Sequence, residues 1–363
     1  MASMFEGLQL PGGADFHVHL RDGAMMETVV PTIRQGGVDM VYVMPNLLPP
    51  ITTVAMALEY RKRLQTLAPD VHFLMSLYLH PSITPEVVIE AKKAGIRGIK
   101  AHKVYPSGVT TNSSSGVQDL GVFYPVFREM MEQDLVLNLH GECPSRDDVT
   151  VLNAEERFLP TLLKLHHDFP RLRIVLEHCS TEAAVAAVFN AGETVVGSIT
   201  PHHLSLIIDD WAGDSINYCK PVAKTPRDRM ALLKAAASGD PKFFLGSDSA
   251  PHSIQAKQGG QDGKGKHAAG VWTQPFVLSY ALDALEQGCR LGLLDSGQLT
   301  KKTLAGFLGE HGRTFYKEAS SERRIIVGPS GSTQIPEVVE SKDHSVKIIP
   351  FRRGQYTRGL DWM

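Results

Sequence analysis

Short apolar runs alternate with amphipathic segments between Ala14 and Ser247, and this alternation is the main structural pattern in the sequence. The short runs are rich in β-branched and aromatic residues, which is typical of strands, and the segments between them repeat apolar residues with a helical period. The predicted strands are Ala14–His19, Met40–Met44, Val71–Leu79, Gly98–Val104, Leu135–His140, Arg173–His178, Glu193–Ile199 and Phe243–Ser247. The clearest predicted helices are Val54–Leu67, Thr84–Ala94, Phe123–Gln133, Ala154–His166 and Arg227–Ser238.

This order of elements predicts an α/β fold. Strands that alternate with helices form a parallel sheet, and eight such units close into a (β/α)8 TIM barrel of about 250 residues. From about Gln274 onward the chain holds two further helical patterns and a polar tail with the β-like run HSVKIIPF. We expect this C-terminal helical and strand extension to pack on the barrel, so that residues 1–363 form a single domain.

Composition narrows the possible classes of function. The chain is 43% hydrophobic with a formal net charge of -2, so it can bury a core but lacks the basic footprint of a nucleic-acid binder. The four cysteines lie far apart, which argues against a zinc ribbon or a disulfide framework and fits a reducing compartment. The N-terminus has no signal-peptide pattern, and no run of about 18 apolar residues occurs. We therefore expect a soluble, cytoplasmic protein that acts on a small molecule, without a nucleic-acid or membrane partner.

Polar residues gather where the predicted strands end, which is where a TIM barrel builds its active site. His17 and His19 are two residues apart on the first strand and therefore point to the same side. Alone, such a pair is more often hydrogen-bonded than metal-bound. The fifth, sixth and eighth strands, however, end in His140, His178 and Asp248. Four histidines and one carboxylate at one barrel rim favour a zinc site.

The fourth predicted strand contributes Lys103, in the run His102-Lys103-Val104-Tyr105-Pro106. A lysine that faces a barrel interior must be neutral, paired or chemically changed, because a buried unpaired ammonium is too costly. A carbamate formed with CO₂ would turn its amine into a carboxylate-like bridge, although the residues alone favour a salt-bridged lysine. Lys100 is a rival three residues earlier, and strand alternation puts the two lysines on opposite faces.

Taken together, these motifs resemble the dihydroorotases of the amidohydrolase superfamily, in the branch of many bacterial and the single-function fungal enzymes. The resemblance spans nearly the whole chain, through the segments DFHVHLRDGAMMETVVP, VYVMPNLLPPITT, KVYPSGVTTNSSSG, LNLHGE, LEHCST, TPHHL, NYCKPVAK and FLGSDSAPH. It implies a reversible, zinc-dependent cyclisation of N-carbamoyl-L-aspartate to L-dihydroorotate with loss of water, the third step of de novo pyrimidine biosynthesis. It also suggests a homodimer.

The resemblance implies two zinc ions per chain, bridged by a hydroxide and by a carbamylated lysine (N6-carboxylysine). The zinc ligands would be His17, His19 and Asp248 for one ion, and His140 and His178 for the other. The family's Lys-x-Tyr-Pro arrangement favours Lys103 over Lys100 as the modified residue. Asp248 would be the catalytic residue that takes the proton of the attacking water and passes it to the leaving nitrogen. We therefore expect cyclisation at lower pH and hydrolysis at higher pH.

The same resemblance implies a set of substrate contacts on the loops that follow the strands. They are Arg21, Asn46 and His252 for the carboxylate, backbone groups near Lys220 and Ala269 for the ring, and Thr110 and Thr111 on a lid. The lid is predicted over residues 106–116, where small and hydroxyl residues follow the fourth strand. A guanidinium such as that of Arg21 supplies the planar fork that a carboxylate prefers.

Other polar residues receive no site role from the sequence. The adjacent pair His166 and His167 is typical of solvated helix surface, and His203, beside His202, matches a family histidine that does not bind metal. Glu142 matches the family's HGE motif but receives no role from the sequence. The main departures from the family pattern are the Gly- and Lys-rich stretch Lys257–Lys266 and the basic ending around Arg352, Arg353 and Arg358.

Two alternatives remain at this point. A hydantoinase or dihydropyrimidinase would share every metal ligand, but Arg21 and Asn46 favour a substrate with a free carboxylate. A non-catalytic scaffold relative is the second alternative, and the complete ligand set argues against it.

Overall fold

The structure, a computed structural model, describes residues 3–101, 119–145, 147–260 and 265–363. Within these residues, eight strands form one parallel sheet, with each strand beside the next one in the sequence. The strands are β2 (Gly13–Val18), β3 (Val38–Val43), β4 (His72–Tyr78), β5 (Gly98–Ala101), β6 (Val136–His140), β7 (Ile174–Glu177), β8 (Val195–Ile199) and β9 (Phe243–Leu245). A parallel bridge between Val18 and Ser249 joins the first strand to the segment after the last, which closes the barrel.

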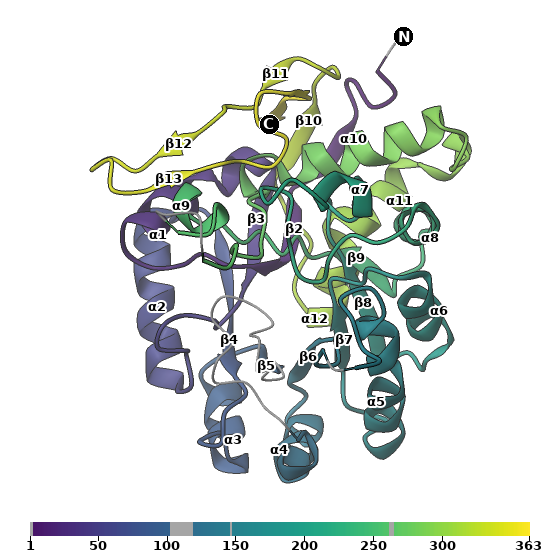
Figure 1. Ribbon diagram of the computed structural model, residues 1–363. Coiled ribbons are helices and arrows are strands. Elements are labelled where there is room, and N and C mark those ends of the chain that lie inside the picture. Colours follow the sequence, from purple (N-terminus) through teal and green to yellow (C-terminus); the bar gives the residue numbers. More distant parts are fainter. Residues whose placement is uncertain (1–2, 102–118, 146, 261–264) are drawn as a thin grey trace.

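Helices surround this barrel, as the TIM-barrel prediction requires (Figure 1). They are α1 (Gly23–Val29), α2 (Val54–Leu67), α3 (Pro85–Lys93), α4 (Tyr124–Glu132), α5 (Ala154–Asp168), α6 (Glu182–Asn190) and α8 (Pro226–Ala237). Their start points follow local capping chemistry. The Thr53 side chain accepts a hydrogen bond from the Met56 amide at the start of α2, and Thr225 and Asp228 form a capping box at the start of α8. No described helix has the length and apolar character to cross a membrane.

Alternate residues of each strand pack into two separate layers, one inside the barrel and one beneath the helices. In β3, Tyr42 belongs to the inner cluster and Val41 to the outer one. The inner cluster also includes Phe16 of β2 and Tyr316 of α12 (His311–Tyr316), whose rings stack with centroids 5.1 Å apart. The inner apolar layer therefore fills the barrel and leaves one rim for polar residues.

The C-terminal extension packs against the barrel and the N-terminal segment. It contains α10 (Val277–Arg290), α11 (Lys301–Ala305), a π-helical turn (Gly306–Glu310) and α12. The N-terminal β1 (Gln9–Pro11) pairs with β10 (Arg324–Val327), which pairs with β15 (Leu360–Trp362). Both chain ends therefore lie on one side of the molecule (Figure 1). The extension was expected, but its pairing with β1 was not, and the run HSVKIIPF contributes only the short strand β13 (Lys347–Ile348).

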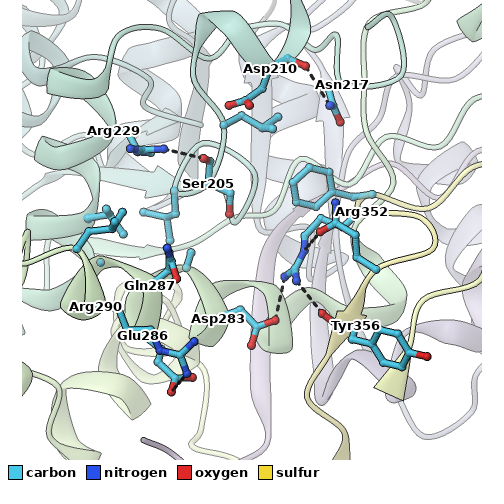
Figure 2. A pocket seen from close by; sticks show the side chains of 18 of the residues that line it. Ser205, Asp210, Asn217, Arg229, Asp283, Glu286, Gln287, Arg290, Arg352 and Tyr356 are labelled. Atoms are coloured by element: carbon cyan, nitrogen blue, oxygen red, sulfur yellow. Dashed lines mark hydrogen bonds and ion pairs between the residues drawn. The ribbon is translucent and has the colours of Figure 1, made fainter. Parts of the chain in front are cut away.

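Two arginines of the basic C-terminal ending form hydrogen bonds with acidic residues of α10. The Arg358 side chain is fully buried and donates hydrogen bonds to Asp283 and Glu286, and Arg352 Nη1 lies 2.8 Å from Asp283 Oδ2. Asp283 and Arg352 also line a cavity of about 750 Å³ (Figure 2). The described residues that line this cavity include none of the predicted site residues. Arg352 and Arg358 thus join the C-terminal segment to α10, and the predicted site residues lie elsewhere.

Candidate active site

The C-terminal ends of four strands bring the predicted metal ligands together. His17 lies in β2, His140 ends β6, and His178 follows β7. The ring centroids of His17 and His178 are 5.1 Å apart, and those of His140 and His178 are 4.6 Å apart. Asp248, which follows β9, completes the group, because one donor atom each from His17, His178 and Asp248 lie within 4.8 Å of one another.

Asp248 is the anionic centre of this group. Its Oδ1 lies 3.0 Å from His19 Nε2 and 3.3 Å from His17 Nε2. Burial lowers the pKa of both histidines, so these rings are neutral at pH 7 and the contacts are not ion pairs. Burial also raises the pKa of Asp248, against the opposing charges of His17 and Lys100. Neutral imidazoles beside a carboxylate are the donor set that zinc prefers.

Three of the predicted site residues adopt backbone conformations that non-glycine residues rarely take. Arg21, His178 and Asp248 have φ angles of 60°, 43° and 47°, all in the left-handed region. Each such residue costs on the order of 1–3 kcal/mol, so the surrounding structure must hold it in place. For His178 part of that support is a 2.8 Å hydrogen bond from its amide to Ser198 Oγ. The backbone conformation of these three residues therefore lowers the free energy of unfolding.

A buried carboxylate that the sequence analysis missed, Glu177, fixes the orientation of His17. Its Oε2 accepts hydrogen bonds from His17 Nδ1 at 2.7 Å and from Ser198 Oγ at 2.8 Å, and its Oε1 accepts one from the Asn138 amide. Burial acts to raise the pKa of Glu177, but the charge of Lys100 and the hydrogen bonds from His17 and Asn138 outweigh it and lower the pKa to about 2. With the proton on Nδ1, the Nε2 lone pair of His17 faces Asp248. The sequence signal that could have indicated Glu177 was a single carboxylate within an otherwise apolar predicted strand.

The carboxylates of Asp15 and Glu142 also contact this group, through backbone amides and the His140 ring. Asp15 Oδ1 accepts hydrogen bonds from the amides of Ser247 and His17, and burial raises the pKa of Asp15 to about 7. Glu142 Oε2 lies 2.8 Å from His140 Nε2. Burial acts to raise the pKa of Glu142, but its contact with His140 and the nearby lysines outweigh this and lower it. The structure thus places Glu142 beside His140, whereas the sequence analysis gave Glu142 no role.

Lys100, which the sequence analysis set aside, points into the barrel. Its neighbours Ile99 and Ala101 pack in the outer cluster, while the Lys100 side chain is fully buried on the other face of β5. Its amine has no hydrogen-bond partner among the residues that the structure describes. Burial lowers the pKa of this amine to about 8. The preferred lysine, Lys103, lies outside the described residues, as do Thr110, Thr111 and the whole predicted lid.

The predicted substrate contacts Arg21, His252 and Ala269 lie together beside the histidine group. Arg21 Nε donates to the Pro251 carbonyl at 2.9 Å, and Arg21 Nη2 lies 3.1 Å from His252 Nε2. The same His252 nitrogen lies 2.9 Å from the Ala269 carbonyl oxygen. Burial lowers the pKa of Arg21 to about 10, which leaves it cationic at neutral pH, and its charge also lowers the pKa of His19. A cation therefore stands next to the candidate metal ligands.

The other predicted contacts on described residues are Asn46 and Lys220. Asn46 is buried after β3, and Lys220 is half-buried, with burial lowering the pKa of its amine. Lys257, from the stretch that departed from the family pattern, donates to the carbonyls of Tyr218, Ala268 and Gly270. Its ammonium thus holds the backbone on both sides of Ala269, and this gives that departure a structural role.

Comparisons with known proteins agree with this arrangement. The amidohydrolase family matches residues 8–282. The chain is 54% identical to a probable dihydroorotase of Schizosaccharomyces pombe and 45% identical to the dihydroorotase of Saccharomyces cerevisiae; the alignments cover 98% and 97%, respectively, of both chains. The crystal structure of the S. cerevisiae enzyme in complex with 5-fluoroorotic acid superimposes with a TM-score of 0.87 and covers 98% of each chain at 45% identity.

Proposed function

This chain belongs to the amidohydrolase family and, within it, to the dihydroorotases, and on that premise we propose that it interconverts N-carbamoyl-L-aspartate and L-dihydroorotate. The observation that carries the proposal is the convergence of His17, His178 and Asp248 beside the cationic Arg21. In the biosynthetic direction the side-chain carboxylate closes onto the carbamoyl nitrogen with loss of water. The substrate is a small acid in de novo pyrimidine synthesis.

The donor set fits two zinc ions at this rim. His17, His19 and Asp248 would hold one ion, and His140 and His178 the other. The fit rests on the neutral imidazoles and on His178 Nδ1, a buried nitrogen without a partner among the described residues. When bound, the ions would polarise an amide carbonyl and acidify a water molecule. A carbamate on Lys103 and a hydroxide would bridge them, as the resemblance implies.

Asp248 moves the proton in this proposal. In hydrolysis its carboxylate oxygen takes a proton from the attacking water and delivers it to the ring nitrogen that leaves. In cyclisation it takes a proton from the carbamoyl nitrogen as that nitrogen attacks the side-chain carboxyl carbon. It returns this proton to the carboxyl oxygen whose bond to carbon breaks, and a second proton from solvent completes the water that leaves. Burial raises the pKa of Asp248, which makes it a better proton acceptor than an exposed aspartate. Glu177 holds His17 in the required tautomer while this happens.

Arg21, with Asn46 and His252, would bind the carboxylate that remains on the ring. The guanidinium offers two parallel donors, and its partial burial strengthens the pairing. Backbone groups near Lys220 and Ala269 would contact the ring, and Lys257 holds the Ala269 segment in position. Thr110 and Thr111 would reach the substrate from the lid. A hydantoinase-type substrate without a carboxylate would leave Arg21 unpaired, which disfavours that alternative.

The resemblance further suggests that the enzyme acts in the cytoplasm as a homodimer. Sedimentation of the purified protein at micromolar concentration tests the second point directly.

The decisive experiment supplies purified protein with zinc and follows both directions of the reaction. Carbamoyl-aspartate is given at mildly acidic pH and dihydroorotate at alkaline pH, with dihydrouracil and hydantoin as uncharged control substrates. We expect turnover of the two acids and at least a hundredfold lower kcat/KM for the uncharged rings, about 2.7 kcal/mol of discrimination. Equal turnover of dihydrouracil would instead support the alternative, and no turnover of any of them would support a scaffold role.

A further inference from the structure

Tyr60 of α2 contacts the loop that carries Arg21. Its hydroxyl donates a hydrogen bond to the backbone carbonyl oxygen of Arg21 at 2.5 Å. The Tyr60 side chain is 1% exposed and packs in the outer cluster, so close packing holds its ring in one position. Burial raises the pKa of Tyr60 well above its usual range, and the hydroxyl therefore keeps the proton that it donates. A rigid hydrogen-bond donor is thus fixed on the Arg21 backbone.

Arg21 needs such support because its backbone conformation is unfavourable. Its φ angle of 60° lies in the left-handed region, which residues with long side chains rarely adopt. A second contact from α2 holds the next residue: Arg63 Nη1 lies 2.5 Å from Asp22 Oδ1, and the Arg63 guanidinium lies 5.2 Å from the centroid of the Tyr60 ring. This ion pair is largely exposed and should contribute little. Most of the support from α2 therefore comes from the buried hydroxyl.

The backbone of Arg21 determines where its guanidinium lies. Arg21 Nε donates to the Pro251 carbonyl oxygen at 2.9 Å, and Nη2 lies 3.1 Å from His252 Nε2. A change of φ at Arg21 would turn its Cα–Cβ bond and carry the guanidinium away from these partners. A paired contact with a carboxylate tolerates little displacement, because both donors must stay aligned with its two oxygens. The hydrogen bond from Tyr60 therefore bears on carboxylate binding.

We propose that Tyr60 is a positioning residue for the substrate carboxylate and that it acts through the backbone of Arg21. The proposal rests on the proposed function, in which Arg21 binds the carboxylate that remains on the ring. Tyr60 holds the guanidinium in its binding position before the substrate arrives. Binding then does not have to order the Arg21 loop, and this lowers the free-energy cost of forming the complex.

The test begins with Tyr60→Phe, which removes the hydroxyl and keeps the buried ring. The matched control is Tyr280→Phe in α10, because Tyr280 is also fully buried and its hydroxyl donates to the Phe351 carbonyl oxygen at 2.6 Å. We expect Tyr60→Phe to raise KM for dihydroorotate roughly fivefold to tenfold, with less than about twofold change in kcat and no loss of bound zinc. Both variants should lower the unfolding temperature by a similar amount, but Tyr280→Phe should leave KM unchanged.

A double-mutant cycle with Arg21→Met then separates a positioning role from a merely structural one. The quantity compared is kcat/KM for dihydroorotate, which can be measured even where KM is too high to reach. If Tyr60 acts through Arg21, Tyr60→Phe should change kcat/KM by less than about twofold in the Arg21→Met background. The same loss in both backgrounds overturns the proposal, and so does an unchanged KM in Tyr60→Phe alone.

The proposed function fails separately, because it requires turnover of the two acids by the wild-type enzyme. Calorimetric titration with orotate, a ring acid that keeps the carboxylate, compares the wild type with Tyr60→Phe without any turnover. We expect the Kd for orotate to rise by the same factor as KM. Wild-type turnover together with an equal Kd for orotate in the two proteins refutes this inference alone.

Discussion

Two groups of histidines lie close together in the described part of this barrel, and they differ in how well their donor atoms suit a metal ion. The strand-end cluster consists of His17, His19, His140, His178 and Asp248. The second cluster consists of His202, His203 and Cys219, which lie after β8. Each contains three potential ligand residues whose donor atoms lie within 4.8 Å of one another. Proximity and burial alone therefore do not distinguish them.

The difference lies in what the donor atoms already do. His203 uses both ring nitrogens, with Thr200 Oγ1 at 2.8 Å and the Pro221 carbonyl oxygen at 2.9 Å. The Cys219 thiol donates to the same carbonyl, and burial raises the pKa of Cys219 to about 12, so no thiolate is available. His202 alone keeps ring nitrogens without described partners. The strand-end cluster instead combines neutral imidazoles, among them His178 with a buried Nδ1 that has no described partner, with the carboxylate of Asp248. This donor set is the one that zinc prefers.

The largest effect should follow removal of the anion from the strand-end cluster. Asp248→Asn keeps the shape but cannot accept the proton, so kcat should fall roughly 10²- to 10⁴-fold while substrate still binds. Steady-state kinetics in both directions measure this. The matched control in the second cluster is Cys219→Ser, which should change neither kcat nor zinc content by more than about twofold. Near-normal turnover by Asp248→Asn would remove its assigned role.

The contrast between the clusters also separates what the sequence could predict from what it could not. Strand ends are local features, so the sequence placed His140 at the end of the fifth barrel strand and the structure has it there, in β6. The predicted bounds of α2 (Val54–Leu67) agree with the structure, because apolar periodicity and the Thr53 cap are also local. The TIM-barrel prediction and the C-terminal extension are confirmed.

Contacts between distant segments were beyond sequence reasoning. The Glu177–His17 hydrogen bond joins strands 160 residues apart, and nothing near either residue indicates it. The buried ion pairs of Arg358 with Asp283 and Glu286 belong to the same class, and the sequence analysis treated that basic ending only as a departure. The inward orientation of Lys100 depends on strand register, which a motif match does not determine.

A smaller effect is expected next to the strand-end cluster, at Arg21. Arg21→Met keeps an unbranched apolar stem but removes the guanidinium, so the substrate carboxylate loses its partner. We expect KM for dihydroorotate to rise by a factor that corresponds to a loss of about 2 to 5 kcal/mol of binding free energy. The zinc content should change little. Kinetics beside metal analysis separate the two readouts. An unchanged KM would show that the carboxylate binds elsewhere.

Glu177→Gln should weaken the strand-end cluster without removing any ligand. Glutamine keeps one acceptor oxygen in place of two, and it cannot match the charge that holds the proton on His17 Nδ1. We expect zinc affinity to fall about 10- to 100-fold, as for other residues that orient metal ligands. Competition with a zinc chelator measures the change, and the unfolding temperature of the metal-free protein shows whether the fold is intact. If zinc affinity is unchanged while stability collapses, Glu177 is structural only.

The smallest effect concerns acid stability and the second cluster. Burial lowers the pKa of His203 to about 4, from the 6.5 of an unperturbed histidine. The neutral ring therefore contributes stability that is fully present above pH 6.5 and is lost as the pH falls toward 4, because only the unfolded chain binds a proton in that range. Between pH 7 and pH 5.5 this loss amounts to roughly 1 kcal/mol. His203→Gln should remove that part of the pH dependence in urea unfolding, and by the same amount with and without zinc. The strand-end histidines should behave differently, because their acid sensitivity is coupled to metal release. If zinc alters the effect of His203→Gln, then His203 exchanges its protein partners for metal and the distinction between the two clusters is wrong.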